Sequence, residues 1–291
     1  MFRKFSRLFL PNRLDWLCRK KPKKVLLGWN RGLGDIALGL FAIVHRIKTL
    51  SPDAEITFLI RKNLEEGFSL FNEVRVLIAP DWRRGVPYDV EATLRTLKRS
   101  PEEFDLIIPY PKPADWVYWQ YGKLTPKLSW KEEYDSLWKK FNLPQRAIGI
   151  HVHAETDYAL WRNWPEQRLR EFLELAKEEP IILFGLKNSP SFEGDRIIDL
   201  RGKTSLLEII SIVKNCCKAL IAPDSGILST IYYLDAAFPL TLCSLWADPK
   251  HGILKQGVPS PNQKLVHVPL IAIHRDLSAV SAEEVMSRCA E

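Results

Sequence analysis

Three residues in the last third of the chain have the types and spacing of a phosphate-binding turn. Asp224, Ser225 and Gly226 follow a short apolar run at 219–222 and precede apolar residues at helical spacing. A strand that enters a helix through small polar residues leaves backbone N–H groups open at the helix N-terminus, and such groups bind phosphate. The same residues also suit an ordinary strand-to-helix loop in which Asp224 caps the helix. The residues alone leave both interpretations open.

A glycine-rich turn near the start of the chain carries a second candidate carboxylate. Arg31, Gly32, Gly34 and Asp35 follow a strand expected at 24–29 and open an apolar helix. Glycine lets the backbone approach a substrate closely, and doubly wound sheets bind ligands at the carboxyl ends of their strands. Asp35 therefore caps the helix, directs its carboxylate at a ligand, or does both.

This turn also matches a loose form of the dinucleotide-binding fingerprint, because Ala37 follows Gly34 by three residues. The next predicted strand ends in Arg61 and Lys62, where an NAD site has an acidic residue. Arg61 suits the additional phosphate of NADP. An NADP-dependent oxidoreductase therefore remains an alternative function.

Two histidines and an arginine mark the start of the second half. His151 and His153 alternate on a strand expected at 147–153, so their side chains share one face. A metal ion needs a third ligand at suitable spacing, and the sequence offers none, so we expect a buried or cleft-edge pair and no metal site. Arg162 precedes a predicted helix, where it either holds a phosphate or lies on the surface.

Two sheets are needed to position these residues. Strand-like apolar runs alternate with helical patterns in both halves, at 24–29, 56–60, 74–78, 106–108, 147–153, 181–184, 197–200, 219–222 and 240–245. This alternation predicts an α/β protein of two Rossmann-like, doubly wound domains that face a central cleft. We expect a basic aromatic arm at 1–24, domains at 25–144 and 145–275 joined by a linker at 142–145, and a C-terminal helix at 276–291.

The positive charge of the chain is concentrated in its first 24 residues. This arm has nine Lys/Arg against Asp15 and a net charge of +8, whereas the whole chain has +7, so the remainder has −1. A nearly neutral body argues against nucleic-acid binding. Because the arm is also rich in Phe, Leu and Trp, it suits an anionic membrane surface. A basic tail, or a helix docked on the body, is the alternative, and contact of the arm with nucleic acid is the third interpretation.

The remaining bulk features favour a cytoplasmic protein. No apolar run is long enough to span a bilayer. The five cysteines are odd in number and lack metal-binding spacing, which is typical of reduced, buried thiols.

Four stretches, taken in order, resemble the heptosyltransferases of bacterial lipopolysaccharide synthesis, glycosyltransferase family 9. They are Arg31–Asp35, His153–Thr156 with Arg162–Pro165, Leu200–Leu206, and Asp224–Gly226 with Pro239 and Ala247–Pro249 downstream. The resemblance covers about residues 25–260. It implies a GT-B fold, with an acceptor domain first and a donor domain second.

The resemblance also implies roles for individual residues. Asp35 matches the proposed general base, and Arg31, Gly32 and Gly34 belong to its substrate-binding turn. Residues beside the donor phosphates are matched by His153, Thr156, Arg162, Asp224, Ser225 and Gly226. The implied activity is inverting transfer of a sugar, heptose, from an ADP-sugar to a lipid-linked saccharide, without cofactor or metal, on the inner face of the inner membrane.

The chain departs from the family pattern at two positions. Ser229 stands where the donor loop of the family has a histidine, and Arg162 stands where it has a lysine. Arginine keeps the charge but not the geometry of lysine. A non-catalytic sugar-nucleotide or glycolipid-binding protein of the same fold is therefore a further alternative.

Overall fold

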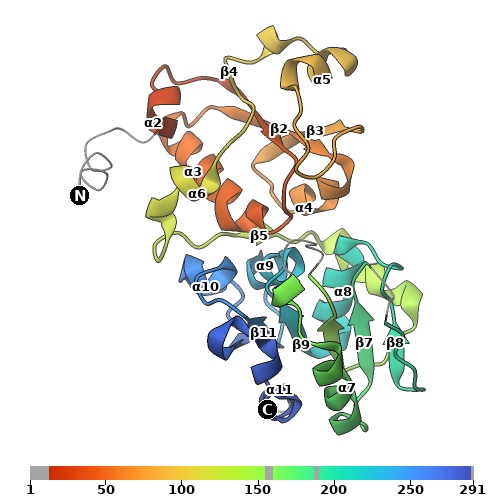
Figure 1. The fold of residues 1–291 in the computed structure, drawn as a ribbon. Coiled ribbons are helices and arrows are strands. Elements are labelled where there is room, and N and C mark those ends of the chain that lie inside the picture. Colours follow the sequence, from red (N-terminus) through yellow and green to blue (C-terminus); the bar gives the residue numbers. More distant parts are fainter. Residues whose placement is uncertain (1–12, 155–159, 187–189, 290–291) are drawn as a thin grey trace, which may run out of the picture. The chain divides into compact units, whose positions relative to one another are not determined.

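A computed structural model describes residues 13–154, 160–186 and 190–289. The chain divides into two units, Met1–Gln120 and Tyr121–Glu291, and each contains its own parallel sheet (Figure 1). The division lies before the linker expected at 142–145. Residues 121–144 belong to the second unit because β5 (Leu128–Ser129) pairs with β10 (Leu234–Asp235) and η5 (Glu132–Phe141) packs on α8 (Leu206–Cys216).

Unit 1 is built on four parallel strands in the order β3-β2-β1-β4. Its elements are α2 (Arg13–Leu17), β1 (Lys24–Trp29), η1 (Ile36–Leu40), α3 (Phe41–Leu50), β2 (Glu55–Arg61), η2 (Lys62–Leu64), α4 (Glu65–Ser69), β3 (Val74–Ala79), α5 (Val90–Thr96), η3 (Pro101–Glu103), β4 (Leu106–Ile108), α6 (Pro113–Trp116) and η4 (Tyr118–Gln120). All four strands predicted for this half are confirmed. Leu26 and Leu59 face a core cluster with Val90 and Leu94 of α5.

The helix predicted after the glycine turn begins as a π-helix, η1, and continues as α3. Gly39 of η1 lies directly against Pro113 at the start of α6, where an added Cβ would stand 2.3 Å from the proline side chain. Glycine is therefore required at this helix–helix contact. π-Helical turns occur frequently at functional sites, and this one follows Asp35.

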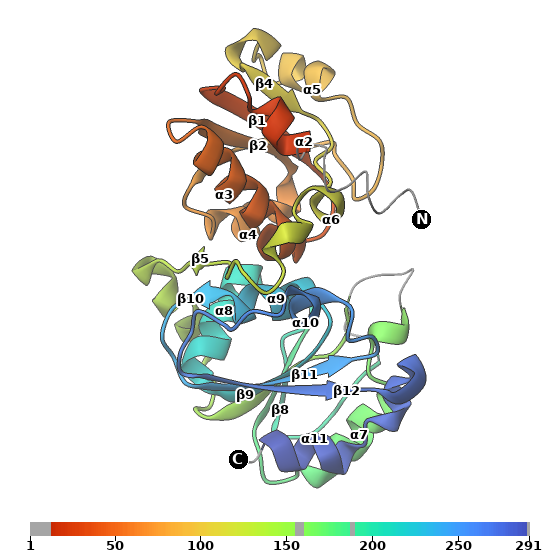
Figure 2. The ribbon, with the colours of Figure 1, turned by 90° about the vertical axis from the view of Figure 1, so that its left-hand side faces the viewer.

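Unit 2 is built on six parallel strands in the order β12-β11-β9-β6-β7-β8. Its further elements are β6 (Ala147–His151), η6 (Leu160–Arg162), α7 (Glu166–Leu175), β7 (Ile181–Phe184), β8 (Ile197–Asp199), β9 (Cys217–Pro223), α9 (Gly226–Tyr232), β11 (Leu240–Trp246), α10 (Gly252–Gln256), β12 (Leu265–Ile271), η7 (Ile273–Arg275), η8 (Leu277–Ala279) and α11 (Ala282–Cys289). Helices α7 and α11 cover one face of the sheet, and α8 and α9 cover the other (Figure 2).

Local sequence signals explain where these elements begin and end. The central strands β6, β7, β9 and β11 are almost entirely buried, as parallel strands covered on both faces must be. The capping box predicted at Ser205 is confirmed, since its hydroxyl accepts from Glu208 N and the Glu208 carboxylate accepts from Ser205 N. All five cysteines are buried and form no disulfide.

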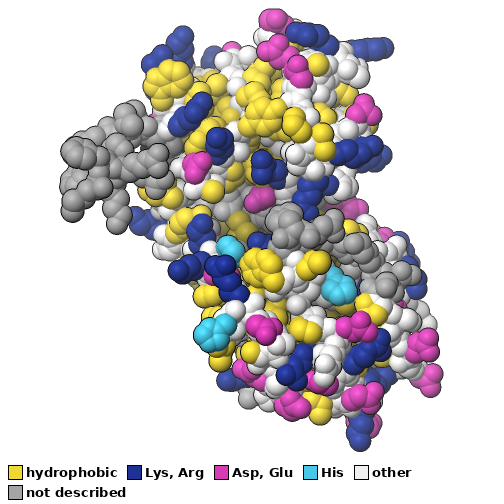
Figure 3. All heavy atoms as spheres, in the orientation of Figure 1, with side chains coloured by type: hydrophobic (Ala, Val, Ile, Leu, Met, Phe, Trp, Pro, Cys, Tyr) yellow, Lys and Arg dark blue, Asp and Glu magenta, His cyan; other side chains and the backbone are white. Residues whose placement is uncertain are grey.

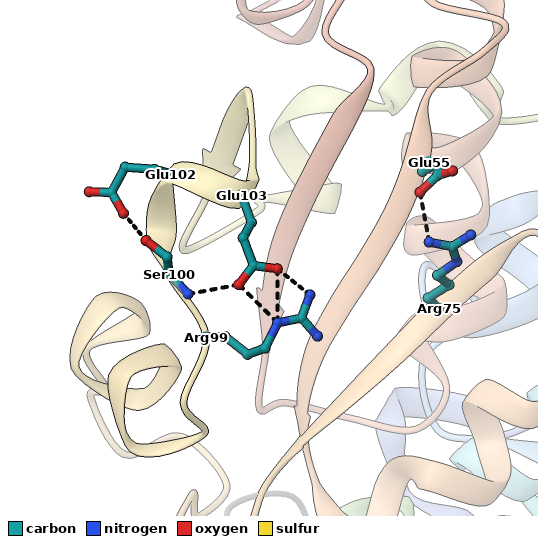
Figure 4. Close-up of polar contacts among 6 residues, drawn as sticks. All are labelled: Glu55, Arg75, Arg99, Ser100, Glu102 and Glu103. Carbon is teal, nitrogen blue, oxygen red and sulfur yellow. Dashed lines mark hydrogen bonds and ion pairs between the residues drawn. The ribbon is translucent and has the colours of Figure 1, made fainter.

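Exposed ion pairs lie on the surface of unit 1 (Figure 4). Arg75 on β3 donates to Glu55 on β2 at 2.7 Å. Arg99 Nε donates to both carboxylate oxygens of Glu103, at 2.9 and 3.0 Å. The Arg99 guanidinium, with the amide of Ser100, lowers the pKa of Glu103 to about 2. These groups face solvent, so they contribute little to stability.

No helix in the described parts of the chain is long and apolar enough to cross a bilayer.

Gly252, the first residue of α10, combines a left-handed backbone with a close approach. Its φ is +50°, and an added Cβ would stand 2.6 Å from the buried ring of Trp246 and 2.7 Å from Asp224 Oδ1. Gly122, in the same unit, also has a left-handed backbone, but an added Cβ would meet nothing within 4 Å. The two glycines therefore separate backbone strain from steric overlap.

We expect Gly252→Ala to destabilise unit 2 more than Gly122→Ala. A left-handed alanine costs about 1–2 kcal/mol at either position, and overlap with a buried ring adds about 1–3 kcal/mol at Gly252 only. Urea unfolding followed by Trp fluorescence measures both free energies. Equal losses in the two variants would contradict the packing described for Gly252.

Candidate functional site

The glycine turn of unit 1 is held in place by hydrogen bonds at the carboxyl edge of its sheet. Asn30 is buried, and its Nδ2 donates to the carbonyls of Arg83 and Val86 at 2.9 and 2.7 Å. Trp29 Nε1 donates to Gly32 O at 3.3 Å, and an Arg61 guanidinium nitrogen donates to Arg31 O at 2.9 Å. The turn therefore has a fixed shape, set by the loops that follow β2 and β3.

Asp35 stands at the end of this turn and is half-buried. Its Oδ2 accepts from the backbone N–H of Gly32 at 3.1 Å. Within the described residues, its side chain makes no capping bond to the first turn of η1. The carboxylate is therefore turned back over the glycine turn, and the capping interpretation of Asp35 is not supported. A side chain at Gly32 would press on it, since an added Cβ would stand 2.8 Å from Oδ2.

Arg61, at the end of β2, is partly removed from water. Burial lowers its pKa, and the positive charge of Arg84 lowers it further. Because guanidinium groups stay protonated at any ordinary pH, two cations are held near the backbone of Arg31. This edge of unit 1 has a positive character suited to an anionic or strongly polar ligand.

In unit 2, Ser225 caps α9, and its hydroxyl also lies next to His151, the last residue of β6. Ser225 Oγ accepts from Leu228 N at 3.2 Å and lies 3.2 Å from His151 Nδ1. Ser225 and His151 thus share one hydrogen bond, which the hydroxyl donates when Nδ1 carries no proton. Burial lowers the pKa of His151 to about 4, and the charge of His153 contributes to the shift. The buried option for this histidine is confirmed, and it holds the serine rotamer.

Asp224 is a buried carboxylate paired with Arg162. The closest oxygen–nitrogen distance is 3.4 Å, and the Asp224 residue is only 8 % exposed. Burial raises the pKa of Asp224, and Asp248 raises it further, whereas Arg162 and His251 act to lower it. Arg162 is not a simple surface residue: it lies over the ring of Trp161 at 5.3 Å. Its buried Nε has no hydrogen-bond partner among the described residues.

A second acidic group, Asp248, lies close enough to Asp224 to raise its pKa. Its Oδ1 accepts from Lys250 N at 2.9 Å, and its Oδ2 accepts from Arg275 at 2.5 Å. The Lys250 amide, Arg275 and His251 lower the pKa of Asp248, so it remains charged. Sequence reasoning missed Arg275 and His251 as site residues. The only signal nearby was the turn at Asp248-Pro249, which contains the carboxylate that both residues contact.

A pocket of about 500 Å³ opens beside this cluster. It is lined by His153, Leu160, Trp161, Asn163, Trp164, Pro165, Glu166, Arg275, Asp276 and Leu277. His153 therefore lies at the edge of a cavity, whereas His151 is buried and does not line it. Ser229 lies within α9, and its buried hydroxyl donates to Ser225 O at 3.1 Å.

The predicted site residues thus form two separate groups, one on each unit. Arg31, Gly32, Gly34 and Asp35 share the carboxyl edge of the first sheet. The carboxyl edge of the second sheet brings together His153, Arg162, Asp224, Ser225 and Gly226. Thr156 lies outside the described residues.

Comparisons with known proteins identify the fold. No protein-family model matches the chain, and no curated protein matches it. Among solved structures it is similar to ADP-heptose lps heptosyltransferase II of E. coli, with 16 % identity over 92 % of this chain and 97 % of that chain, and a TM-score of 0.65.

Two other structures agree with this likeness. A family 9 glycosyl transferase from Veillonella parvula has 14 % identity, covers 92 % of this chain and 96 % of its own, and has a TM-score of 0.63. E. coli heptosyltransferase WaaC, solved with ADP-2-deoxy-2-fluoro heptose, has 14 % identity over 91 % and 98 % of the two chains and a TM-score of 0.53. The chain therefore has the GT-B fold of the family 9 heptosyltransferases, as its sequence predicted.

Proposed function

We propose that the chain is an inverting glycosyltransferase that moves a sugar, heptose, from an ADP-sugar to a lipid-linked saccharide in lipopolysaccharide core or related glycan synthesis. The observation that carries this proposal is the pairing of the buried Asp224 with the partly exposed Arg162 beside the Ser225 turn, on a unit of the heptosyltransferase fold. Unit 2 would bind the donor, and unit 1 would bind the acceptor.

The leaving group in this reaction is a nucleoside diphosphate, which gains negative charge as the anomeric bond breaks. Arg162 and the amide groups at the start of α9 are positioned to stabilise this charge. Asp224 cannot bind phosphate itself, because like charges repel. Its role is to hold the guanidinium of Arg162 and to accept hydrogen bonds from sugar hydroxyls. This account requires no metal ion.

The acceptor hydroxyl needs a base on the opposite face of the sugar. Asp35 is the candidate, because its carboxylate lies over a glycine turn in which a substrate can approach the backbone. Attack in line with the leaving diphosphate would invert the anomeric configuration.

Donor binding is tested by thermal shift with ADP, ADP-heptose, UDP-sugars and NADPH, each with and without EDTA. We expect ADP and ADP-heptose to stabilise the protein equally with and without EDTA. Arg162→Ala should weaken ADP binding about 10- to 100-fold, because a charged hydrogen bond is lost, and Arg162→Lys should recover part of it. Arg170→Ala, which removes an exposed arginine of α7, is the control. Stabilisation by NADPH alone would favour the oxidoreductase instead.

The role of Asp35 is tested by Asp35→Asn in a sugar-transfer assay. We expect turnover to fall about 10²- to 10⁴-fold, the usual contribution of a general base, while ADP affinity stays unchanged. Asp53→Asn, at an exposed position of unit 1, should be fully active. Full activity of Asp35→Asn would remove it as the base. Donor binding without transfer to any acceptor would favour the non-catalytic binding protein.

A lipid-linked acceptor gives the basic N-terminal segment a function on an anionic membrane. Within it, α2 is docked on α3: Leu14 and Cys18 are buried, and Asp15 forms a two-point ion pair with Arg46 at 2.8 and 2.9 Å. Trp16 remains 50 % exposed, under the guanidinium of Arg19 at 4.7 Å. An exposed Trp among cations is typical of a membrane-interface contact.

Membrane binding is tested by co-sedimentation with anionic and with neutral vesicles. We expect the full chain to bind anionic vesicles only and to be released by salt, and a chain starting at Lys24 to lose binding. Because that truncation also removes the buried Leu14, Trp16→Ser serves as a second variant that leaves α2 docked, and it should weaken binding. Equal binding by all three proteins would refute a membrane role for this segment.

A further inference from the structure

Three aromatic rings pack in a row, called here the ring stack, at the carboxyl edge of the sheet in unit 1. The rings of Trp82 and Tyr88 are stacked with centroids 3.7 Å apart, and the ring of Tyr110 is tilted by 42° against Tyr88 with centroids 4.6 Å apart. Trp82 is only 8 % exposed, whereas Tyr110 is 49 % exposed. The stack therefore has a buried end and an open end, and Tyr110 forms the open end.

The ring of Tyr110 is held in one orientation by its own hydroxyl group. That oxygen accepts from Tyr88 N at 3.4 Å and donates to the carbonyl of Tyr88. Tyr88 is itself fixed, because its hydroxyl donates to Pro109 O at 2.6 Å. Gly28 of β1 makes room for this arrangement: an added Cβ would stand 2.6 Å from Pro109 O and 3.0 Å from the Tyr88 hydroxyl. A surface tyrosine with no role does not need such support.

The open ring lies at the same sheet edge as the glycine turn. β4 pairs in parallel with β1, so Tyr110, two residues after β4, and Asp35, six residues after β1, follow neighbouring strand ends. The bonds from Asn30 to the carbonyls of Arg83 and Val86 tie the loop between Trp82 and Tyr88 to that turn. Burial raises the pKa of the Tyr88 hydroxyl, and Arg31 is close enough to act against this shift.

Hydrophobic side chains gather over the same unit (Figure 3). Val86, 51 % exposed, adjoins the ring stack in sequence. Exposed apolar groups that are held rigidly, at the same sheet edge as a candidate base, indicate a binding surface.

We propose that the open face of Tyr110 is a platform on which a pyranose ring of the acceptor stacks. This inference rests on the proposed function, because it assumes a saccharide acceptor in unit 1. The carbon-bound hydrogens of a sugar ring carry partial positive charge and pack on the negative face of an aromatic ring. One ring face matches one sugar unit, and the hydroxyl groups at its rim remain free for Arg31 and Asp35. Because the tyrosine is already ordered, little side-chain entropy is lost on binding.

The test uses oligosaccharides released from core-truncated lipopolysaccharide by deacylation, titrated into the full chain and followed by saturation-transfer NMR. Tyr110→Ala should weaken saccharide binding about three- to tenfold, the equivalent of one aromatic contact, and should raise the KM for the acceptor by about the same factor with little change in kcat. Tyr110→Phe keeps the ring face and should bind within about twofold of the parent.

Tyr118→Ala is the matched control, because Tyr118 is 54 % exposed on η4 of the same unit and belongs to no ring stack in the described residues. It should bind the saccharides as the parent does. Unchanged binding by Tyr110→Ala, or no binding of any saccharide by the parent, would overturn the inference. ADP thermal shifts on the same samples separate the two proposals: a failure of ADP binding counts against the proposed function, whereas saccharide binding that ignores Tyr110 counts against the platform alone.

Discussion

The burial of the Asp224 carboxylate is the constraint around which the carboxyl edge of unit 2 is built. A charge withdrawn from water must be matched by opposite charge or by hydrogen bonds. Arg162 supplies the direct match, from the loop that follows β6, and His251 supplies a second positive neighbour. Asp248 works against this balance as a like charge, and Arg275, which follows β12, offsets it by pairing with Asp248. Gly252 packs directly against Asp224 and Trp246, and any larger residue at this position would overlap with them.

At the carboxyl edge of each sheet, a buried polar side chain holds the candidate functional loops in place. In unit 1, the buried amide of Asn30 joins the loops after β1 and β3. In unit 2, the neutral, buried His151 fixes Ser225 at the start of α9. In each case a buried, uncharged polar side chain is hydrogen-bonded to the loop, so it rigidifies the loop. Preorganised loops of this kind suit a reaction in which charge moves, because little reorganisation accompanies the chemical step.

Local signals predicted most of the fold, and their failures have physical causes. Strands β1 and β7 have the predicted bounds, because short runs of apolar residues bounded by turn residues are read without knowledge of the partner strand. Strand β12 was not predicted from the sequence. It contains Pro269, and its Val266 and Ile271 are exposed. Proline and solvent exposure argue against a central strand, but β12 lies at the sheet edge, where both are tolerated. Because Arg275 follows β12, missing the strand also meant missing the partner of Asp248.

By itself, the sequence determined the parallel strands of the two main sheets other than β12, the two βα halves, the turns that carry Asp35 and Ser225, and the capping box at Ser205. These features depend on apolar periodicity and on residues a few positions apart, which is why they can be read locally. Only the tertiary structure decided that Arg162 meets Asp224, that His151 holds Ser225, and that Tyr110 closes a stack begun by Trp82. Those contacts join residues that are distant in the chain, and strand order and burial, not composition, set which of them meet.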